Sequence, residues 1–345
     1  MGIRVTQNMM VRNYLRAYNR NLSYVSKSEQ RMLGQKYNKA SENISDTSRA
    51  LRVRQNLFDN EVYTTNIRDA NARLEAAENN LTSINEILEK AREQIINKAA
   101  NDPSASARET LATELDNLKD EMVQFMNAQF SDSYLFGGTE NGEPPFAVGE
   151  DGRLTYHGFA VDDITFDADQ QKYIYTNPET GEQLPVPEDG EQYVDIGMGM
   201  TMNGDSVNSN SAFKISFSGL EVFGCGKDEN GVSQNIFNML KDAADILRKE
   251  PFDREALENV SVAMKDSRED LTLQISGIGT QTQFLETSLD RLDKENLTLT
   301  TLQQKLEVTD TAVESMNWKV YTALLNATYQ FSSQVLPNTL MDFIR

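Results

Sequence analysis

The sequence predicts a mainly α-helical protein with a small β domain inserted between two helical regions, which pair as an antiparallel long-helix rod or coiled coil. Apolar residues recur every seven positions toward both ends of the chain, a pattern typical of long helices that bury one stripe. Glycine and proline, which interrupt helices, gather in the middle. Fifteen of 19 glycines lie in residues 137–231, and five of eight prolines lie in residues 144–187.

The N-terminal region is expected to form three helices. Apolar residues at alternating spacings of four and three predict the first over residues 11–32. The period is lost in residues 34–47, which are expected to form a loop, and it resumes over residues 53–100 as a second helix. The second helix carries a heptad series of apolar residues: Ile67, Leu74, Leu81, Leu88 and Ile95. A stop and restart at Asp102-Pro103 precedes a third helix over residues 111–125.

The middle of the chain shows strand signals. Short β-branched or aromatic runs at residues 134–136, 164–166, 173–175 and 213–217 are bounded by turn residues and predict a small antiparallel β domain. This region is also acidic, since residues 130–235 contain 19 Asp and Glu against 4 Lys and Arg, a balance of -15.

Helical periodicity returns in the C-terminal region. A helix is predicted from Ile236, with a pause at Glu250-Pro251, and a second from Asp253 almost to Leu336, in which Gly277 and Gly279 mark the expected bend. Seven heptad positions in it are apolar: Leu285, Leu292, Leu299, Leu306, Val313, Val320 and Ala327. The stripes of residues 53–99 and 285–306 are expected to form an internal core.

Three domains are predicted from this pattern. Residues 1–45 with 311–345 form a terminal coiled-coil domain for assembly, residues 46–129 with 236–310 a helical rod, and residues 130–235 an acidic, β-rich outer domain. If the insert projects from a rod, the helices before and after it run antiparallel, so the first helix should contact the last.

The two terminal helices are expected to carry an interface with other copies. Their apolar and aromatic residues spread over more than one face, which a contact between two helices cannot cover. The predicted assembly residues are Val11, Leu15, Tyr18, Leu22, Val25, Val313, Val320, Leu324, Ala327 and Phe331.

The chemistry of an enzyme or a metal site is not found in the sequence. His157 is the only histidine, so two-histidine metal sites are excluded, and we expect it to be a surface residue at a strand end. Asp162-Asp163 lacks the spacing of a calcium loop, and no cofactor, metal or catalytic residue is predicted. Cys225 is the only cysteine, which excludes a disulfide within the chain.

The charge of the chain limits its partners. A net charge of -20 argues against nucleic acid and against anionic membrane surfaces. The longest uncharged run, residues 320–341, is interrupted by polar residues and is not expected to span a membrane. The first ten residues lack the apolar segment of a secretory signal, so any export is expected to occur without a cleavable signal peptide.

Several segments resemble bacterial flagellin-type proteins: RVTQNMM at residues 4–10, the loop of residues 34–46, and LPNTLMDF at residues 336–343. Within that family, YLFGGT at residues 134–139, followed by Pro145-Phe146, resembles the hook-associated protein 3 subfamily of hook-filament junction proteins. The resemblance covers roughly residues 1–150 and 236–345.

The resemblance implies a structural role in the bacterial flagellum, as a junction layer between hook and filament that assembles through coiled coils. It implies an extracellular location after type III export, and terminal segments that fold on assembly. The implied partners are copies of the chain, hook-associated protein 1 on the hook side, flagellin on the filament side, and an export chaperone.

Two alternatives remain open on sequence grounds. One is a filament flagellin, which usually lacks the segment of residues 134–146. The other, from a different class, is a calcium-dependent adhesin or glycan-binding module on a helical stalk, for which the acidic insert would supply the binding site.

Overall fold

The protein is described by a computed structural model that covers residues 7–34, 36–37, 39–99, 104–139, 142–167, 172–186, 191–204, 206–208, 211–228 and 231–335. The chain divides into two compact units. Unit 1 comprises Met1–Glu61 and Asp293–Arg345, and unit 2 comprises Val62–Leu292. The predicted division into three domains has other boundaries and stays a prediction.

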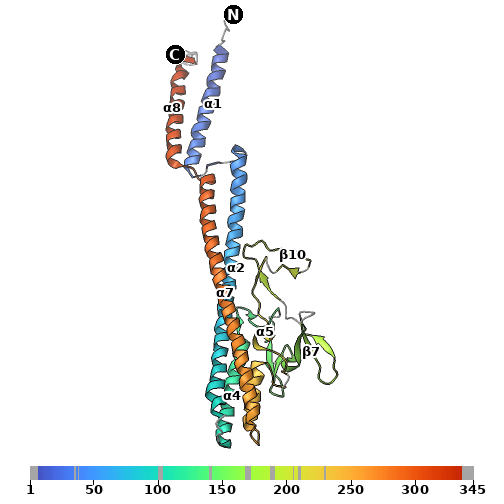
Figure 1. Ribbon diagram of the computed structural model, residues 1–345. Coiled ribbons are helices and arrows are strands. Elements are labelled where there is room, and N and C mark those ends of the chain that lie inside the picture. Colours follow the sequence, from blue (N-terminus) through green and yellow to red (C-terminus); the bar gives the residue numbers. More distant parts are fainter. Residues whose placement is uncertain are drawn as a thin grey trace. The chain divides into compact units, whose positions relative to one another are not determined.

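The predicted fold class is confirmed: long helices precede and follow a small antiparallel β insert in the sequence, and the insert lies to one side of the long helices of its unit (Figure 1). The α-helices are α1 (Gln7–Met32), α2 (Ile44–Glu89), α3 (Asn97–Ala99), α4 (Ala105–Met126), α5 (Gly219–Phe223), α6 (Ile236–Arg248), α7 (Arg254–Glu307) and α8 (Thr311–Val335). Shorter elements are the 3-10 helices η1 (Ala40–Glu42) and η3 (Val161–Asp163) and the π-helix η2 (Lys90–Ile96).

In unit 1, α1 and α8 lie side by side and run antiparallel (Figure 1). Contacts from Tyr18 to Tyr329 and from Ser28 to Glu314 fix this direction, because the partner's number falls as the number in α1 rises. The expectation that the first helix contacts the last is confirmed. A small apolar cluster in this unit joins α2 to α7 through Ala50, Val53, Leu57, Leu299, Leu302 and Leu306.

The helix predicted from Asp253 almost to Leu336 is interrupted, so this prediction is wrong in one place. α7 ends at Glu307 and α8 begins at Thr311. The backbone N–H groups of residues 312 and 313 donate to the Asp310 carboxylate over 3.0 and 3.2 Å, which caps the new helix. The sequence does contain a signal for this break, because the β-branched residues Val308 and Thr309 precede Asp310, a residue type that often caps helices. The unbroken heptad series across the break obscured that signal. α7 itself continues through Gly277 and Gly279 without a break.

The second predicted helix begins earlier than expected, at Ile44. Asn43 precedes it and accepts a hydrogen bond from the Asp46 N–H over 3.1 Å. The Asn43 amide also donates to the Tyr37 hydroxyl, which in turn donates to the Asp46 carboxylate. These contacts order the start of α2 within the expected loop. The predicted restart at Asp102-Pro103 lies outside the described residues.

The helices of unit 2 enclose the large core of the protein. Its centre is the predicted heptad series, with Leu74, Leu81, Leu88 and Ile95 fully or almost fully buried, together with Leu285 and Leu292. The expectation of an internal core is therefore confirmed. α4 packs against α6 in antiparallel fashion, with Arg248 bound to Glu109 and Asp116.

The insert consists of short antiparallel strands rather than one sheet. Within the described residues they form five small sheets: β1–β2, β3–β4–β5, β6–β7–β8, β9–β12 and β10–β11. The strands are β1 (Gln129–Phe130), β2 (Ser133–Tyr134), β3 (Phe146–Val148), β4 (Leu154–Tyr156), β5 (Phe159–Ala160), β6 (Ile164–Asp167), β7 (Lys172–Thr176), β8 (Gln183–Pro185), β9 (Tyr193–Val194), β10 (Met202–Asn203), β11 (Ser206–Val207) and β12 (Phe213–Lys214).

Of the four predicted strands, the two at residues 164–166 and 173–175 are confirmed as β6 and β7. The other two are shorter than expected. Leu135 and Phe136 follow β2 as buried core residues, and the strand predicted over residues 213–217 ends at Lys214. His157 does lie at a strand end, half-buried in the β4–β5 turn with a positive φ of 46°.

Two buried polar clusters join the insert to the helices of unit 2. Arg73 on α2 donates to the Ser133 hydroxyl and to the carbonyls of Tyr134 and Ile215, and burial lowers its pKa. In the second cluster, buried Asp162 accepts hydrogen bonds from Ser233 over 2.5 Å and from Asn238 over 2.9 Å, and it forms an ion pair with Arg153. These contacts satisfy groups that would otherwise be costly to bury.

Candidate assembly surface

The contact face between α1 and α8 is rich in polar groups. The Asn21 amide donates to the Thr328 hydroxyl over 2.8 Å, and the Ser28 hydroxyl donates to the Glu314 carbonyl over 3.4 Å. The Tyr18 and Tyr329 hydroxyls lie 3.2 Å apart, and this hydrogen bond raises the pKa of Tyr329. The pairing therefore depends on hydrogen bonds more than on apolar burial.

Aromatic rings supply most of the remaining contact between these two helices. The ring of Tyr18 meets that of Tyr329 edge-on at 5.5 Å, and the rings of Tyr24 and Tyr321 lie 5.3 Å apart. Leu325 is a buried aliphatic residue on the α8 side. Each such ring pair stabilises the contact between α1 and α8 by about 1 kcal/mol. These contacts favour one alignment of the two helices but contribute only modest stability.

The pairing also buries a carboxylate. Glu314 is 6% exposed, and its Oε1 atom has no hydrogen-bond partner in the part of the chain that is described. Its other oxygen accepts from Asn317 over 3.3 Å. Because a buried acceptor without a partner costs free energy, the contact face as it stands is not optimised for a stable isolated pair.

A second set of apolar residues of α8 lies on a different face from the one that contacts α1. We call Val313, Met316, Val320, Leu324, Ala327 and Phe331 the α8 stripe. At 100° per residue they fall within an arc of about 80°, centred roughly 115° from the face that contacts α1. Val320 is 52% exposed, Leu324 47% and Phe331 59%, whereas Ser28 is 0% and Thr328 9% exposed. The pair thus buries polar residues and leaves an apolar helix face in solvent.

The ten predicted assembly residues fall into two groups. Half-buried Val11, Tyr18 and Val25 share the face of α1 toward α8. The other seven are exposed: Leu15 and Leu22 on α1, and Val313, Val320, Leu324, Ala327 and Phe331 on α8. The structure thus brings the first group onto the pairing face and leaves the second for other contacts. The role of both groups in assembly stays a prediction.

One member of the stripe was not among the predicted residues. Met316 is 62% exposed and lies between Val313 and Val320, at spacings of three and four. The seven-residue series alone skips it, because the series follows one position in each heptad. The same series changes role at the helix break: Leu285 and Leu292 are buried, but Val313 and Val320 are exposed.

Other kinds of site receive little support from the described residues. In the ranges that the structure covers, no group of three or more His, Cys, Asp or Glu side chains is placed to hold a metal ion. Asp162, one of the carboxylates of the acidic insert, is already paired with Arg153. None of the described helices combines the length and apolar character that crossing a bilayer requires.

The N-terminal part of the chain is similar to a known family of helical regions. Residues 5–141 match the family described as the bacterial flagellin N-terminal helical region, so the resemblance to flagellin-type proteins is confirmed. This region contains α1, α2 and α4 and reaches into the segment that begins at Tyr134. Among curated proteins, no match to the chain is found.

One solved structure has a similar fold, and two others that match the chain have lower TM-scores. A putative flagellar hook-associated protein from Vibrio parahaemolyticus matches with a TM-score of 0.58 and 16% identity, over 77% of this chain and 100% of its own. FlgL from Bacillus cereus has a TM-score of 0.48 and 19% identity, over 73% of this chain and 98% of its own. Flagellar hook associated protein-3 from Legionella pneumophila has a TM-score of 0.48 and 16% identity, over 74% and 98%. At such identities the likeness to the Vibrio protein concerns the fold.

Proposed function

We propose that this protein is a structural component of the bacterial flagellum that forms the junction layer between hook and filament by self-assembly. The observation that carries the proposal is the exposed α8 stripe beside a polar contact face. An isolated molecule gains nothing from this arrangement, whereas packing against further helices would bury the stripe. No catalytic step is part of the proposed role.

The free energy available from the α8 stripe is large enough for assembly. Its five larger members are about half exposed, so complete burial would stabilise the assembly by about 1 kcal/mol for each of these side chains. Five such contacts per copy, repeated around a layer, would offset the cost of ordering the terminal helices. The α1–α8 pair would then be completed by neighbouring copies.

The proposal includes specific partners and a location. Besides copies of itself, we propose hook-associated protein 1 on the hook side, flagellin on the filament side, and a chaperone during export. The location is the extracellular flagellum. These partners rest on the family likeness rather than on contacts within the chain.

The replacement Leu324→Asp tests the proposal. The side chain is half exposed, so the monomer should fold normally, but an Asp forced into an apolar contact should cost about 3 kcal/mol per copy or more. Incorporation into flagella should therefore fall to background, as measured by immunoblotting of purified hook-filament complexes. Circular dichroism of the purified variant checks that the helices remain.

Asn326→Asp is the matched control, since Asn326 is exposed on the same helix away from the stripe. It should incorporate like the wild type. Normal incorporation of Leu324→Asp would show that the α8 stripe is not part of the assembly contact.

Electron microscopy of the purified protein distinguishes the junction protein from a filament flagellin, because a flagellin should form long filaments alone and a junction protein should not.

A further inference from the structure

The two units of the chain carry opposite net charge. Unit 1 has 15 Lys and Arg against 11 Asp and Glu, a balance of +4. Unit 2 has 18 against 42, a balance of -24. Unit 1 is therefore basic, although the net charge of the whole chain is -20. Opposite charges on two parts of one chain favour contacts between unlike parts of different copies.

The positive charge of unit 1 is organised as a stripe on α1. Arg12, Arg16, Arg20 and Lys27 are all exposed, and we call them the cationic stripe. At 100° per residue they fall within an arc of about 80°, roughly 160° from the residues that contact α8. Among the described residues, none of the four has an ion-pair partner. The stripe therefore points away from α8 with its charge uncompensated.

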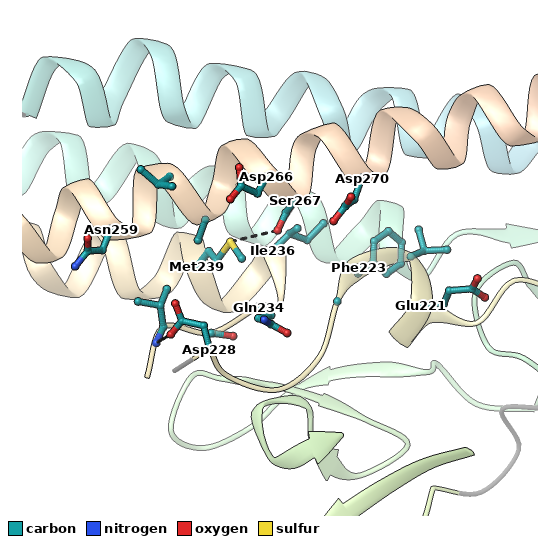
Figure 2. Close-up of a pocket in the computed structure, with 16 residues that line it drawn as sticks. Glu221, Phe223, Asp228, Gln234, Ile236, Met239, Asn259, Asp266, Ser267 and Asp270 are labelled. Atoms are coloured by element: carbon teal, nitrogen blue, oxygen red, sulfur yellow. Dashed lines mark hydrogen bonds between the residues drawn. The ribbon is translucent and has the colours of Figure 1, made fainter. Parts of the chain in front are cut away.

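Unit 2 contains a pocket of the opposite sign. Its cavity of about 410 Å³ is lined by the carboxylates of Glu221, Asp228, Asp266 and Asp270, and no basic side chain is among the described residues that line it. Figure 2 shows the two walls: α7 carries Asp266, Ser267 and Asp270, and α5 with the following loop carries Glu221, Phe223 and Asp228. A concave site lined by one sign of charge concentrates the field and attracts cations.

The inner surface of this acidic pocket is apolar. Phe223, Ile236 and Met239 are almost fully buried and line it, and the Ser267 hydroxyl contacts the Met239 sulfur at 3.9 Å. An arginine fits such a site, because its aliphatic stem packs on apolar groups while its guanidinium binds carboxylates. Exposed Val262 on α7 also lines the pocket and extends the apolar contact.

The spacings on the two surfaces agree. Asp266 and Asp270 are four residues apart on α7, as are Arg16 and Arg20 on α1, which places both pairs about 6 Å apart along their helices. In the described part of the chain, neither Asp266 nor Asp270 has an ion-pair partner. Two helices laid against each other can therefore form both ion pairs together.

We propose that the cationic stripe of α1 docks on the acidic pocket of unit 2 in a second copy of this chain. The inference rests on the proposed self-assembly and adds a second, electrostatic contact to it. It makes the interface heterologous, since unlike surfaces meet, and such contacts continue from copy to copy in a ring or helix.

Charge exchange in the full-length protein tests this contact. The variants are Arg16→Glu/Arg20→Glu and Asp266→Lys/Asp270→Lys, and self-association is measured by sedimentation equilibrium at low salt. Each variant alone should associate about tenfold more weakly than the wild type. An equimolar mixture should recover the lost affinity, because reversed charges on one copy meet reversed charges on the other. Wild-type association should weaken about tenfold between about 0.02 and 0.5 M NaCl.

Arg49→Glu/Arg52→Glu is the matched control, since it changes the net charge equally at exposed positions of α2. An equal loss in this control, a mixture no stronger than either variant, or a wild type that does not associate at low salt would overturn the docking contact. Association that requires Leu324 but ignores these charges would overturn it too, while leaving the proposed function intact. In flagella, normal incorporation of both charge variants beside a failure of Leu324→Asp would contradict the docking contact in the same way.

Discussion

At the scale of single residues, the buried carboxylate of Asp162 shows how the insert is held. It accepts hydrogen bonds from Ser233 and Asn238, while Arg153 bridges it to Asp242. Burial raises the pKa of Asp242, although Arg153 opposes this shift. One arginine therefore compensates two carboxylates from different elements, η3 and α6.

Removal of the Arg153 side chain should therefore destabilise the fold strongly. The variant Arg153→Leu leaves Asp162 buried and without its cation, so the free energy of unfolding should fall by about 3 kcal/mol, as measured by urea denaturation. Lys214→Leu is the comparison, because its ion pair with Glu191 is far more exposed and should contribute less than about 1 kcal/mol. Equal effects of the two changes would mean that Asp162 finds another partner or is hydrated.

Residue burial was predictable where it follows a period, and unpredictable where it depends on partners distant in sequence. The heptad series identified Leu74, Leu81 and Leu88 as core, because helical spacing alone places them on one face. Arg73 is buried one residue away from that series. Its partners Ser133 and Ile215 are 60 and 142 positions distant, and no local pattern connects them.

At the scale of elements, the long helices were predictable because each repeats one signal many times. The strands of the insert are two to five residues long, too short for alternation to identify them, and their pairing is set by turns such as the one at His157. The exposed α8 stripe was only partly predictable. Seven-residue spacing marks an apolar stripe but does not say which face a partner helix covers.

Two glycines in helices provide a paired test at this scale. A Cβ at Gly219, in α5, would lie 2.5 Å from the Phe146 ring and 2.7 Å from the Phe136 carbonyl oxygen. Gly219→Ala should therefore destabilise unit 2 by about 2 kcal/mol through overpacking. At Gly279, in α7, no atom of the described residues outside the helix backbone lies within 4 Å of such a Cβ, so Gly279→Ala should stabilise by about 0.8 kcal/mol. Thermal unfolding of both variants measures the difference, and a shift of the same sign in both would contradict it.

At the scale of the whole molecule, the two units differ in how much apolar surface they bury. Unit 2 holds the large core, whereas unit 1 has a small cluster around Ala50, Val53 and Leu306 and a polar helix pair. Local stability follows buried apolar contacts, so unit 1 should open more often than unit 2 in the free protein.

Limited proteolysis of the dilute monomer measures this difference. Cleavage should remove about the first 40 and the last 35 residues rapidly and leave a resistant fragment that contains unit 2. Mass spectrometry of the fragments locates the cuts. Equal protection of α1, α8 and the helices of unit 2 would mean that the polar contact face is sufficient by itself, and the case for completion by other copies would weaken.

The antiparallel arrangement of α1 and α8 also determines how the pair responds to mechanical load. The start of α1 and the end of α8 are neighbours, so tension applied to those two ends separates the helices progressively, beginning at that end of the pair. Each hydrogen bond between the helices, such as Asn21 with Thr328 or Ser28 with Glu314, then bears the load in turn and breaks at low force. Tension that slides one helix along the other would instead load all of these hydrogen bonds at once. The helix pair should therefore separate easily under tension at its ends and resist tension along its axis.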